Sequence, residues 1–227
     1  MGTELIIGLD VDTREQALTG VEAIGECRYV KIGAQLFTRC GPEIVREVQG
    51  LGKRVMLDLK YHDIPNTVGS AARAAADLGV ALFTLHASGG RKMIEAARED
   101  VDGTDTRILA VTVLTSLTDE VLRDEVGLCE TAAQAVPRLA RQAVESGAHG
   151  IVCSPREIAL VRGAVGPEPL IVTPGVRPEW ASKDDQARVM TPRQAADAGA
   201  NYIVVVRPIL RHQNPAEAVR LILEELH

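Results

Sequence analysis

Eight short apolar runs, rich in β-branched residues, are spread along almost the whole chain and constrain the fold more than any other feature. They occupy residues 5–9, 29–32, 55–59, 80–85, 108–114, 150–153, 170–173 and 202–206. Runs of this kind are typical of strands buried on both faces, as in a parallel sheet. Amphipathic stretches separate them, among them residues 42–48, 67–78, 91–98, 132–144 and 216–226. The alternation predicts an α/β protein.

Four glycines, Gly52, Gly79, Gly147 and Gly199, stand between a predicted helix and the next predicted strand. Glycine just past a helix end adopts the left-handed conformation without a Cβ penalty, so these positions read as helix stops. The chain therefore repeats one helix–glycine–strand unit.

Eight strands alternating with helices in 227 residues fit one compact (β/α)8 TIM barrel. The alternative is an open doubly wound sheet, which commonly carries a GxGxxG fingerprint after its first strand. Here the first strand is followed by DVDT at residues 10–13. Because no linker, low-complexity tract or charge block divides the chain, we expect residues 1–227 to form a single-domain barrel.

Composition narrows the function classes. The chain has 25 Lys and Arg against 31 Asp and Glu, a net charge of −6, which argues against nucleic acid or an anionic membrane as the main partner. The four cysteines form no CxxC pair and no His cluster accompanies them, so neither a zinc site nor a disulfide framework is expected. No apolar run approaches the roughly 18 residues of a membrane span, and we expect a cytoplasmic protein.

Polar side chains follow nearly every predicted strand, where barrel active sites gather. They are Asp10, Lys31, Asp58, Lys60, His86, Thr115, Ser116, Ser154 and Arg207, while Pro174 and Gly175 follow the seventh predicted strand. In a strand Asp58 and Lys60 project to the same side and Leu59 to the other. An ammonium between carboxylates stays protonated, which suits a general acid, although a salt bridge closing the barrel end explains the pair equally well.

Two further segments indicate a phosphate site. The stretch from Pro174 to Pro192 is long and polar, as active-site lids often are, and Arg207 directly follows the eighth predicted strand. Loops after strands seven and eight commonly bind phosphate in barrels, so Gln186 and Arg207 are natural donors. By contrast His86 is more typical of a structural group, and Cys153 of a core residue.

The string DLKYHDIPNT at residues 58–67 resembles the orotidine 5′-monophosphate decarboxylase family in its shorter bacterial form. The resemblance covers nearly the whole chain, since GLD (8–10), VKIG (30–33), HASGG (86–90), VLTS (113–116), TPGVR (173–177) and DDQ (184–186) occur in the family's order. The DxKxxDIPNT pattern is highly specific. The resemblance implies decarboxylation of orotidine 5′-monophosphate to UMP without a cofactor or metal.

The resemblance also implies residue roles. Lys60 would protonate C6 of the pyrimidine within a charged array of Lys31, Asp58 and Asp63. Asp63 and Thr67 would come from the second subunit of a homodimer. The implied substrate contacts are Asp10, Lys31, Ile64, Thr67, Thr115, Ser116, Pro174, Arg177, Gln186, Val206 and Arg207.

One position departs from the family pattern. Where the family usually has glycine before the last arginine, this chain has Val206. A positive φ there would be a steric outlier for a branched residue, so we expect activity with weakened phosphate binding. Three alternatives stay open: a Mg²⁺-dependent decarboxylase or aldolase acting on acyclic sugar phosphates, an epimerase-like barrel with a His and Asp metal site, and a non-catalytic nucleotide-binding protein.

Overall fold

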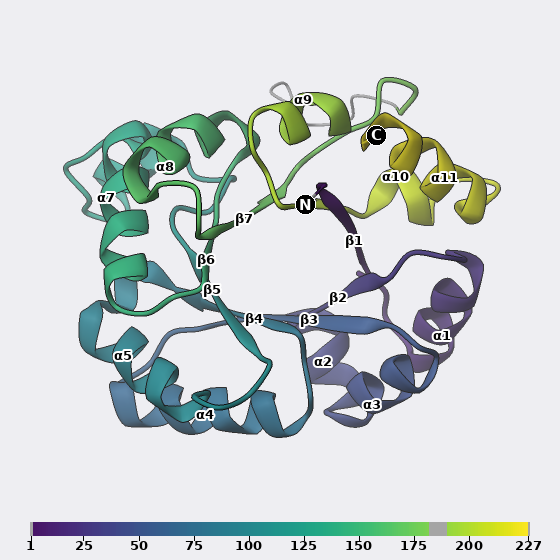
Figure 1. Cartoon of the computed structure of the whole chain (residues 1–227), viewed down its shortest axis with the longest axis horizontal. Helices are drawn as coiled ribbons and strands as arrows, with labels where there is room; N and C mark the ends of the chain where they lie inside the picture. Colours follow the sequence, from purple (N-terminus) through teal and green to yellow (C-terminus); the bar gives the residue numbers. More distant parts are fainter. Residues whose placement is uncertain (1, 182–189, 227) are drawn as a thin grey trace.

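Eight parallel strands close into a barrel in the computed structural model, which describes residues 2–181 and 190–226 (Figure 1). The strands are β1 Glu4–Gly8, β2 Tyr29–Gly33, β3 Arg54–Tyr61, β4 Leu82–His86, β5 Arg107–Val111, β6 Gly150–Val152, β7 Leu170–Pro174 and β8 Tyr202–Val205. Each strand pairs with its neighbour in sequence, and β8 closes the ring by pairing with β1. The expected (β/α)8 barrel is confirmed.

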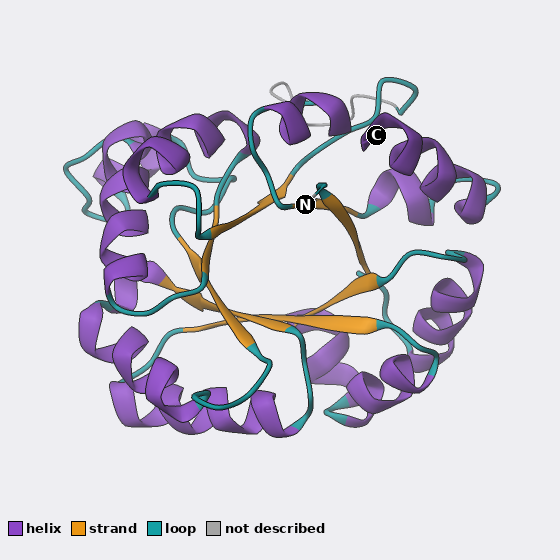
Figure 2. Ribbon diagram, viewed as in Figure 1, coloured by secondary structure: helices purple, strands orange, loops and turns teal. Residues whose placement is uncertain are grey.

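Helices surround the strand ring on its outside, as Figure 2 shows. The α-helices are α1 Arg14–Ala23, α2 Ala34–Cys40, α3 Glu43–Gly50, α4 Pro65–Asp77, α5 Arg91–Asp100, α6 Asp119–Asp124, α7 Ala132–Glu145, α8 Ile158–Val165, α9 Pro192–Asp197, α10 Arg207–Leu210 and α11 Pro215–Leu226. Two 3-10 turns are η1 Ala87–Gly89 and η2 Pro155–Glu157. None of these described helices has both the length and the apolar character needed to cross a membrane.

The apolar runs are explained by two core layers. On β1, Leu5 and Ile7 pack outward against the helices, whereas Ile6 packs inside the barrel with Tyr29 and Val204. Successive strand residues therefore alternate between two apolar environments, and both faces of a strand need apolar side chains. The helix-stop prediction is also confirmed, because Gly79 and Gly147 have φ of +71° and +98°.

Each predicted strand is off by one to three residues at one or both of its ends. β3 continues to Tyr61 instead of stopping at residue 59, and β8 ends at Val205, one residue early. β5 ends at Val111 rather than at residue 114. The apolar sequence continues past β5 because Val113 is buried at the barrel rim without extending the ladder, and Leu114 is exposed. The four cysteines are all free.

Candidate active site

Four charged side chains converge where β1, β2 and β3 end. Lys31 Nζ on β2 donates to Asp10 Oδ1 at 2.8 Å and lies 3.7 Å from Asp58 Oδ2 on β3. Lys60 Nζ lies 2.9 Å from both oxygens of the Asp58 carboxylate. The order Asp10, Lys31, Asp58, Lys60 gives a row of alternating charges. All four were read as strand-end residues in the sequence, and the structure brings their side chains together. Their catalytic roles stay predictions.

The two residues at the ends of this row are more exposed to solvent than the two in its middle. The Lys31 and Asp58 side chains are only 11% and 12% exposed, whereas Asp10 is 45% and Lys60 36% exposed. Burial raises the pKa of the Asp58 carboxyl, but nearby Lys31 and Lys60 and the hydrogen bonds from Lys60 and Thr84 outweigh it. The pKa of Asp58 therefore lies below its ordinary value. Asp58 stays ionised at neutral pH and holds two cations in place.

The backbone at Lys60 departs from regular strand geometry. Lys60 has φ of +51°, and it is the one non-glycine residue with positive φ in the described part of the chain. The pairing between β3 and β4 shifts register between Leu57 and Tyr61. Simple strand alternation predicted that Asp58 and Lys60 share a side. They do meet, but through a bulge that the sequence pattern did not reveal.

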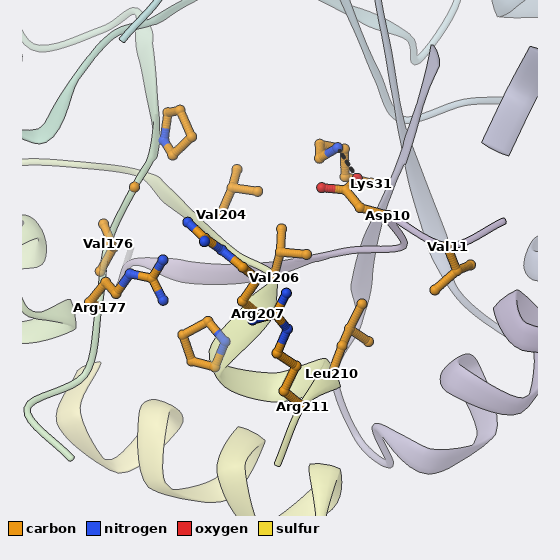
Figure 3. A pocket seen from close by; sticks show the side chains of 13 residues that line it. Asp10, Val11, Lys31, Val176, Arg177, Val204, Val206, Arg207, Leu210 and Arg211 are labelled. Atoms are coloured by element: carbon orange, nitrogen blue, oxygen red, sulfur yellow. Dashed lines mark hydrogen bonds and ion pairs between the residues drawn. The ribbon is translucent and has the colours of Figure 1, made fainter. Parts of the chain in front are cut away.

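A cavity of about 540 Å³ is lined by Asp10 and Lys31 of the charged row, whereas Asp58 and Lys60 are not among its described lining residues. Figure 3 shows the Arg177 and Arg207 guanidinium groups on one side of it and the Asp10–Lys31 pair on the other. Pro174 lines it too, while Arg177 is 6% exposed and its backbone amide donates to Met190 O at 2.9 Å. Arg211 lines the cavity as well, so it offers several cations for an anion and, on the other side, the Asp10–Lys31 end of the charged row. Gln186, predicted to join the two arginines, lies outside the described residues.

Val206 lies in the same cavity and fits a complementary gap. It has φ of −126° and ψ of −85°, so the positive φ that would have strained a branched residue does not occur. Its Cγ2 atom lies 2.5 Å from the position that a Cβ at Gly8 would occupy. A side chain at residue 8 would therefore clash with Val206, and the absent Cβ of Gly8 makes room for it.

Five other predicted site residues lie away from the row. Asp63, Ile64 and Thr67 are exposed around the start of α4, and Asp63 Oδ1 accepts only a local hydrogen bond, from Ile64 N at 2.6 Å, among the described contacts. Thr115 and Ser116 are exposed in a turn, four and five residues beyond β5, not at the strand end itself. Within one copy of the chain, no described hydrogen bond or ion pair joins these residues to Lys60.

The remaining candidates have structural surroundings. His86 lies at the end of β4, its ring 5.4 Å from that of His62, and both line a second cavity of about 410 Å³. Burial, together with His62 and Lys60, lowers the pKa of His86 below its ordinary value. Cys153 is buried in the core, as predicted, and burial raises the pKa of its thiol. The described residues contain no group of three or more His, Cys, Asp or Glu side chains arranged to hold a metal ion.

Thr84 is the functional candidate that the sequence analysis missed. It is fully buried on β4, and its hydroxyl contacts both Asp58 and the Lys60 amide. The signal was present: Thr84 is the one polar residue in the apolar run at 80–85, two residues before His86. In a strand that spacing places both side chains on the same face.

The geometry can now be compared with known proteins. The model of the orotidine 5′-phosphate decarboxylase / HUMPS family matches residues 3–222. The chain belongs to this family. The resemblance inferred from the DxKxxDIPNT pattern is thereby confirmed.

Individual relatives agree with the family match. The chain is 49% identical to the orotidine 5′-phosphate decarboxylase of Heliobacterium modesticaldum over 98% of this chain and 95% of that protein. It is 56% identical to that of Anaeromyxobacter sp. strain K over 87% and 86% of the two chains. The crystal structure of orotidine 5′-phosphate decarboxylase from Lactobacillus acidophilus superposes with a TM-score of 0.90 at 37% identity, covering 99% of both chains.

Proposed function

We propose that this protein decarboxylates orotidine 5′-monophosphate to UMP and CO₂, with Lys60 as the general acid. Membership of the family supports the class of enzyme, a carboxy-lyase. The observation that carries the residue assignment is the Lys31–Asp58–Lys60 row, whose Lys31 lines a cavity that Arg177 and Arg207 also line. A nucleotide has the matching parts: a dianionic phosphate at one end and a reacting ring at the other.

Each end of the substrate has chemically suitable partners. Arg177 and Arg207 are fork-shaped cations that bind phosphate oxygens in pairs, and Gln186 is proposed to join them. On the other side of the cavity Asp10 accepts from ribose hydroxyls and Lys31 donates to them. Pro174 and Val206 supply apolar wall. Thr115 and Ser116 are assigned to the pyrimidine by family resemblance, and Ile64 is assigned to the substrate without a specified contact.

The chemical step needs a proton donor fixed at C6. When the C6–carboxylate bond breaks, its electron pair stays on C6 in an orbital in the plane of the ring, so resonance with the ring helps little. The Lys60 ammonium stabilises this charge and transfers its proton to C6, becoming a neutral amine that regains a proton from water. Because Asp58 already holds the ammonium in place, little reorganisation is needed at the moment of reaction.

Asp58 also acts on the bound reactant. An ionised carboxylate beside the substrate carboxylate raises the energy of the complex, and the repulsion relaxes as neutral CO₂ departs. We assign this effect a smaller share than stabilisation of the carbanion by Lys60. The reaction requires roughly 20 kcal/mol of barrier reduction, near the upper end for enzymes. Phosphate binding by the arginines contributes through organisation of the charged row.

The decisive assay follows the loss of orotidine 5′-monophosphate by absorbance and identifies the product by chromatography. We expect stoichiometric UMP and unchanged turnover in excess chelator. Turnover that disappears with chelator and returns with Mg²⁺ would instead favour the enzymes acting on acyclic sugar phosphates. Binding of the nucleotide without turnover would make the protein a nucleotide-binding module.

We further propose that the site is completed across a homodimer by Asp63 and Thr67. In one chain both are exposed, and Ile64 beside them, at 66%, is the most exposed large apolar residue in the described part of the chain. A partner subunit covering this surface would bury Ile64 and bring Asp63 toward the charged row.

Differently tagged Asp63→Asn and Lys60→Ala chains test this arrangement when co-expressed and purified as heterodimers. If Asp63 acts across the interface, each heterodimer has one site with both native residues, and we expect about half of wild-type activity. If Asp63 acts within its own chain, no native site forms and the heterodimer stays as inactive as its parents.

A further inference from the structure

Thr84 holds a position that no other buried threonine of the described chain shares. Four threonines are buried: Thr84, Thr106, Thr112 and Thr173. The hydroxyls of the last three donate to backbone carbonyls of neighbouring segments. Thr84 instead donates to Asp58 Oδ1 at 2.9 Å and accepts from the Lys60 backbone N–H at 3.0 Å. One hydroxyl group therefore joins two members of the charged row.

The contact with Lys60 lies inside the irregular stretch of β3. The pairing advances from Leu57↔Phe83 to Tyr61↔Leu85, so four steps along β3 oppose two steps along β4. Two extra residues must be accommodated between these pairs, which is the signature of a bulge. Within it the Lys60 amide bonds to the Thr84 side chain. The hydroxyl thus satisfies a backbone donor at the place where the register shifts.

The left-handed backbone at Lys60 depends on such support. A non-glycine residue at φ +51° persists only where its surroundings fix it, and strain of this kind clusters at functional sites. At this position the side chain of Lys60 folds back onto Asp58, with Nζ 2.9 Å from each oxygen. The backbone conformation and the ion pair are therefore parts of one arrangement.

The contact with Asp58 fixes the other half of the arrangement. The Asp58 carboxylate accepts hydrogen bonds from the Lys60 ammonium and the Thr84 hydroxyl, and it forms an ion pair with Lys31. The Asp58 side chain is only 12% exposed. Since one lone pair of the Thr84 oxygen is occupied by the Lys60 amide, its proton is free to point at Asp58. This orientation favours the ionised carboxylate.

We propose that Thr84 is a positioning residue for the general acid, coupling the Lys60 backbone to the Asp58 carboxylate through its hydroxyl. It does not contact the reacting atoms in this assignment. It fixes where the ammonium stands and keeps its carboxylate partner charged. The inference rests on the proposed function, because it takes Lys60 to be the proton donor.

Two substitutions at this position separate the hydroxyl from the methyl group. Thr84→Val keeps the shape and removes the hydroxyl, and we expect kcat to fall about 10- to 100-fold with KM for orotidine 5′-monophosphate changed less than about threefold. Thr84→Ser keeps the hydroxyl and should restore most of kcat. Thr106→Val is the matched control, since it removes a buried hydroxyl bonded to Val80 O near the start of β5 and should leave kcat unchanged. If valine prevents folding, Thr84→Cys with its weak S–H donor replaces it, with the same expectation.

A second readout follows the charge on Asp58. Removing one of the hydrogen bonds that lower the pKa of Asp58 should raise that pKa, so the acid limb of the kcat profile should move to higher pH in Thr84→Val. Carboxyl ¹³C NMR should report the same shift in the ligand-free protein. The NMR shift tests the inference even if the wild-type protein fails to convert orotidine 5′-monophosphate, a result that would overturn the proposed function alone.

The inference is wrong if Thr84→Val keeps wild-type kcat and an unchanged pH profile. It is equally wrong if Thr84→Ser is as impaired as Thr84→Val, because the methyl packing would then matter and not the hydroxyl. A kcat loss in Thr106→Val equal to that in Thr84→Val would also overturn it, since general loss of core stability would then explain both.

Discussion

Strand β3 has a lysine at each end, and the two lysines bind different kinds of partner. Lys53, just before the strand, donates to the backbone carbonyls of Gly25 at 2.6 Å and Cys27 at 2.9 Å. Lys60, near the other end, binds the carboxylate of Asp58, which Lys31 and Thr84 also contact. Lys53 binds neutral backbone carbonyls in the turn between α1 and β2, and so holds this turn against the barrel. Lys60 belongs to a set of charges that depend on one another.

The same difference extends to the two ends of the barrel. At the end where the strands begin, Tyr29 packs edge-on against Tyr202 and accepts a hydrogen bond from Arg54 at 2.9 Å. The Tyr29 and Tyr202 rings form an aromatic plug at this end of the barrel, and the Arg54 side chain beside them is exposed. At the other end Asp10 and Lys31 line a cavity, and Asp58 and Lys60 continue the charged row from Lys31. Mutually dependent charges are costly to bury, and their concentration at one end marks that end as functional.

Exchanging each β3 lysine for alanine tests this division most strongly. Lys60→Ala removes the proton donor, so we expect kcat to fall by at least about a thousandfold while the fold is retained. Lys53→Ala should leave kcat unchanged and lower the free energy of unfolding by about 1–2 kcal/mol, because two carbonyls lose a charged donor. Steady-state assays and urea unfolding of both variants measure the two effects. Wild-type turnover in Lys60→Ala, or lost turnover in Lys53→Ala, would remove the distinction.

Val206 provides a test at the end of the barrel where the charged row and the cavity lie. Val206→Gly gives the backbone freedom to approach the phosphate, and gaining one charge-assisted hydrogen bond should lower KM for orotidine 5′-monophosphate about tenfold. The unfolding free energy should drop by about 0.5–1 kcal/mol from added backbone entropy. Initial-rate kinetics and calorimetry follow the change. An unaltered KM would mean that Val206 does not weaken phosphate binding.

Tyr29→Phe is a test at the opposite end. The substitution removes the oxygen that accepts from Arg54 but keeps the buried ring. We expect a loss of about 0.5–1.5 kcal/mol, seen as a fall of a few degrees in Tm, with kcat and KM unchanged. A clear drop in kcat would show that the aromatic plug and the charged row are coupled through the barrel interior.

The smallest expected effect concerns pH. His149 at the start of β6 accepts a hydrogen bond from Ile108 N at 3.0 Å, and burial, with Arg98 and Arg107 nearby, lowers its pKa. Below about pH 6.5 this histidine is protonated in the unfolded chain, whereas His149 in the folded protein stays neutral until the pH reaches its lower pKa. The free energy of unfolding therefore decreases as the pH falls toward the folded pKa. His86 contributes in the same direction.

We therefore expect His149→Gln to flatten the slope of unfolding free energy against pH between 7 and 5, by at most about 1.4 kcal/mol per pH unit. Denaturant titrations at several pH values measure it. A slope equal to that of the wild-type protein would assign the pH dependence to other groups.

The barrel could be predicted from the sequence because strands buried on both faces need apolar residues at nearly every position. Ile6 and Ile7 face opposite cores, and both must be apolar. The ends of strands were less predictable. Thr112 and Val113 are buried at the rim, so the apolar pattern continues after the β5 ladder stops.

The site was predictable where chemistry requires a residue type and not where it depends on backbone path. Asp10, Lys31, Asp58 and Lys60 follow from charges at strand ends. The positive φ of Lys60 and the hydroxyl of Thr84 depend on the register shift between β3 and β4, which no local pattern specifies. Contacts expected from a second subunit, and the expected cytoplasmic location, stay predictions.

The most direct test of the account is a crystal structure of the protein with UMP bound. We expect the Lys60 ammonium to point at C6 of the pyrimidine at about 3–3.5 Å, with the phosphate between Arg177 and Arg207. A pyrimidine ring lying elsewhere, with Lys60 turned toward solvent, would contradict the assignment of Lys60 as the proton donor.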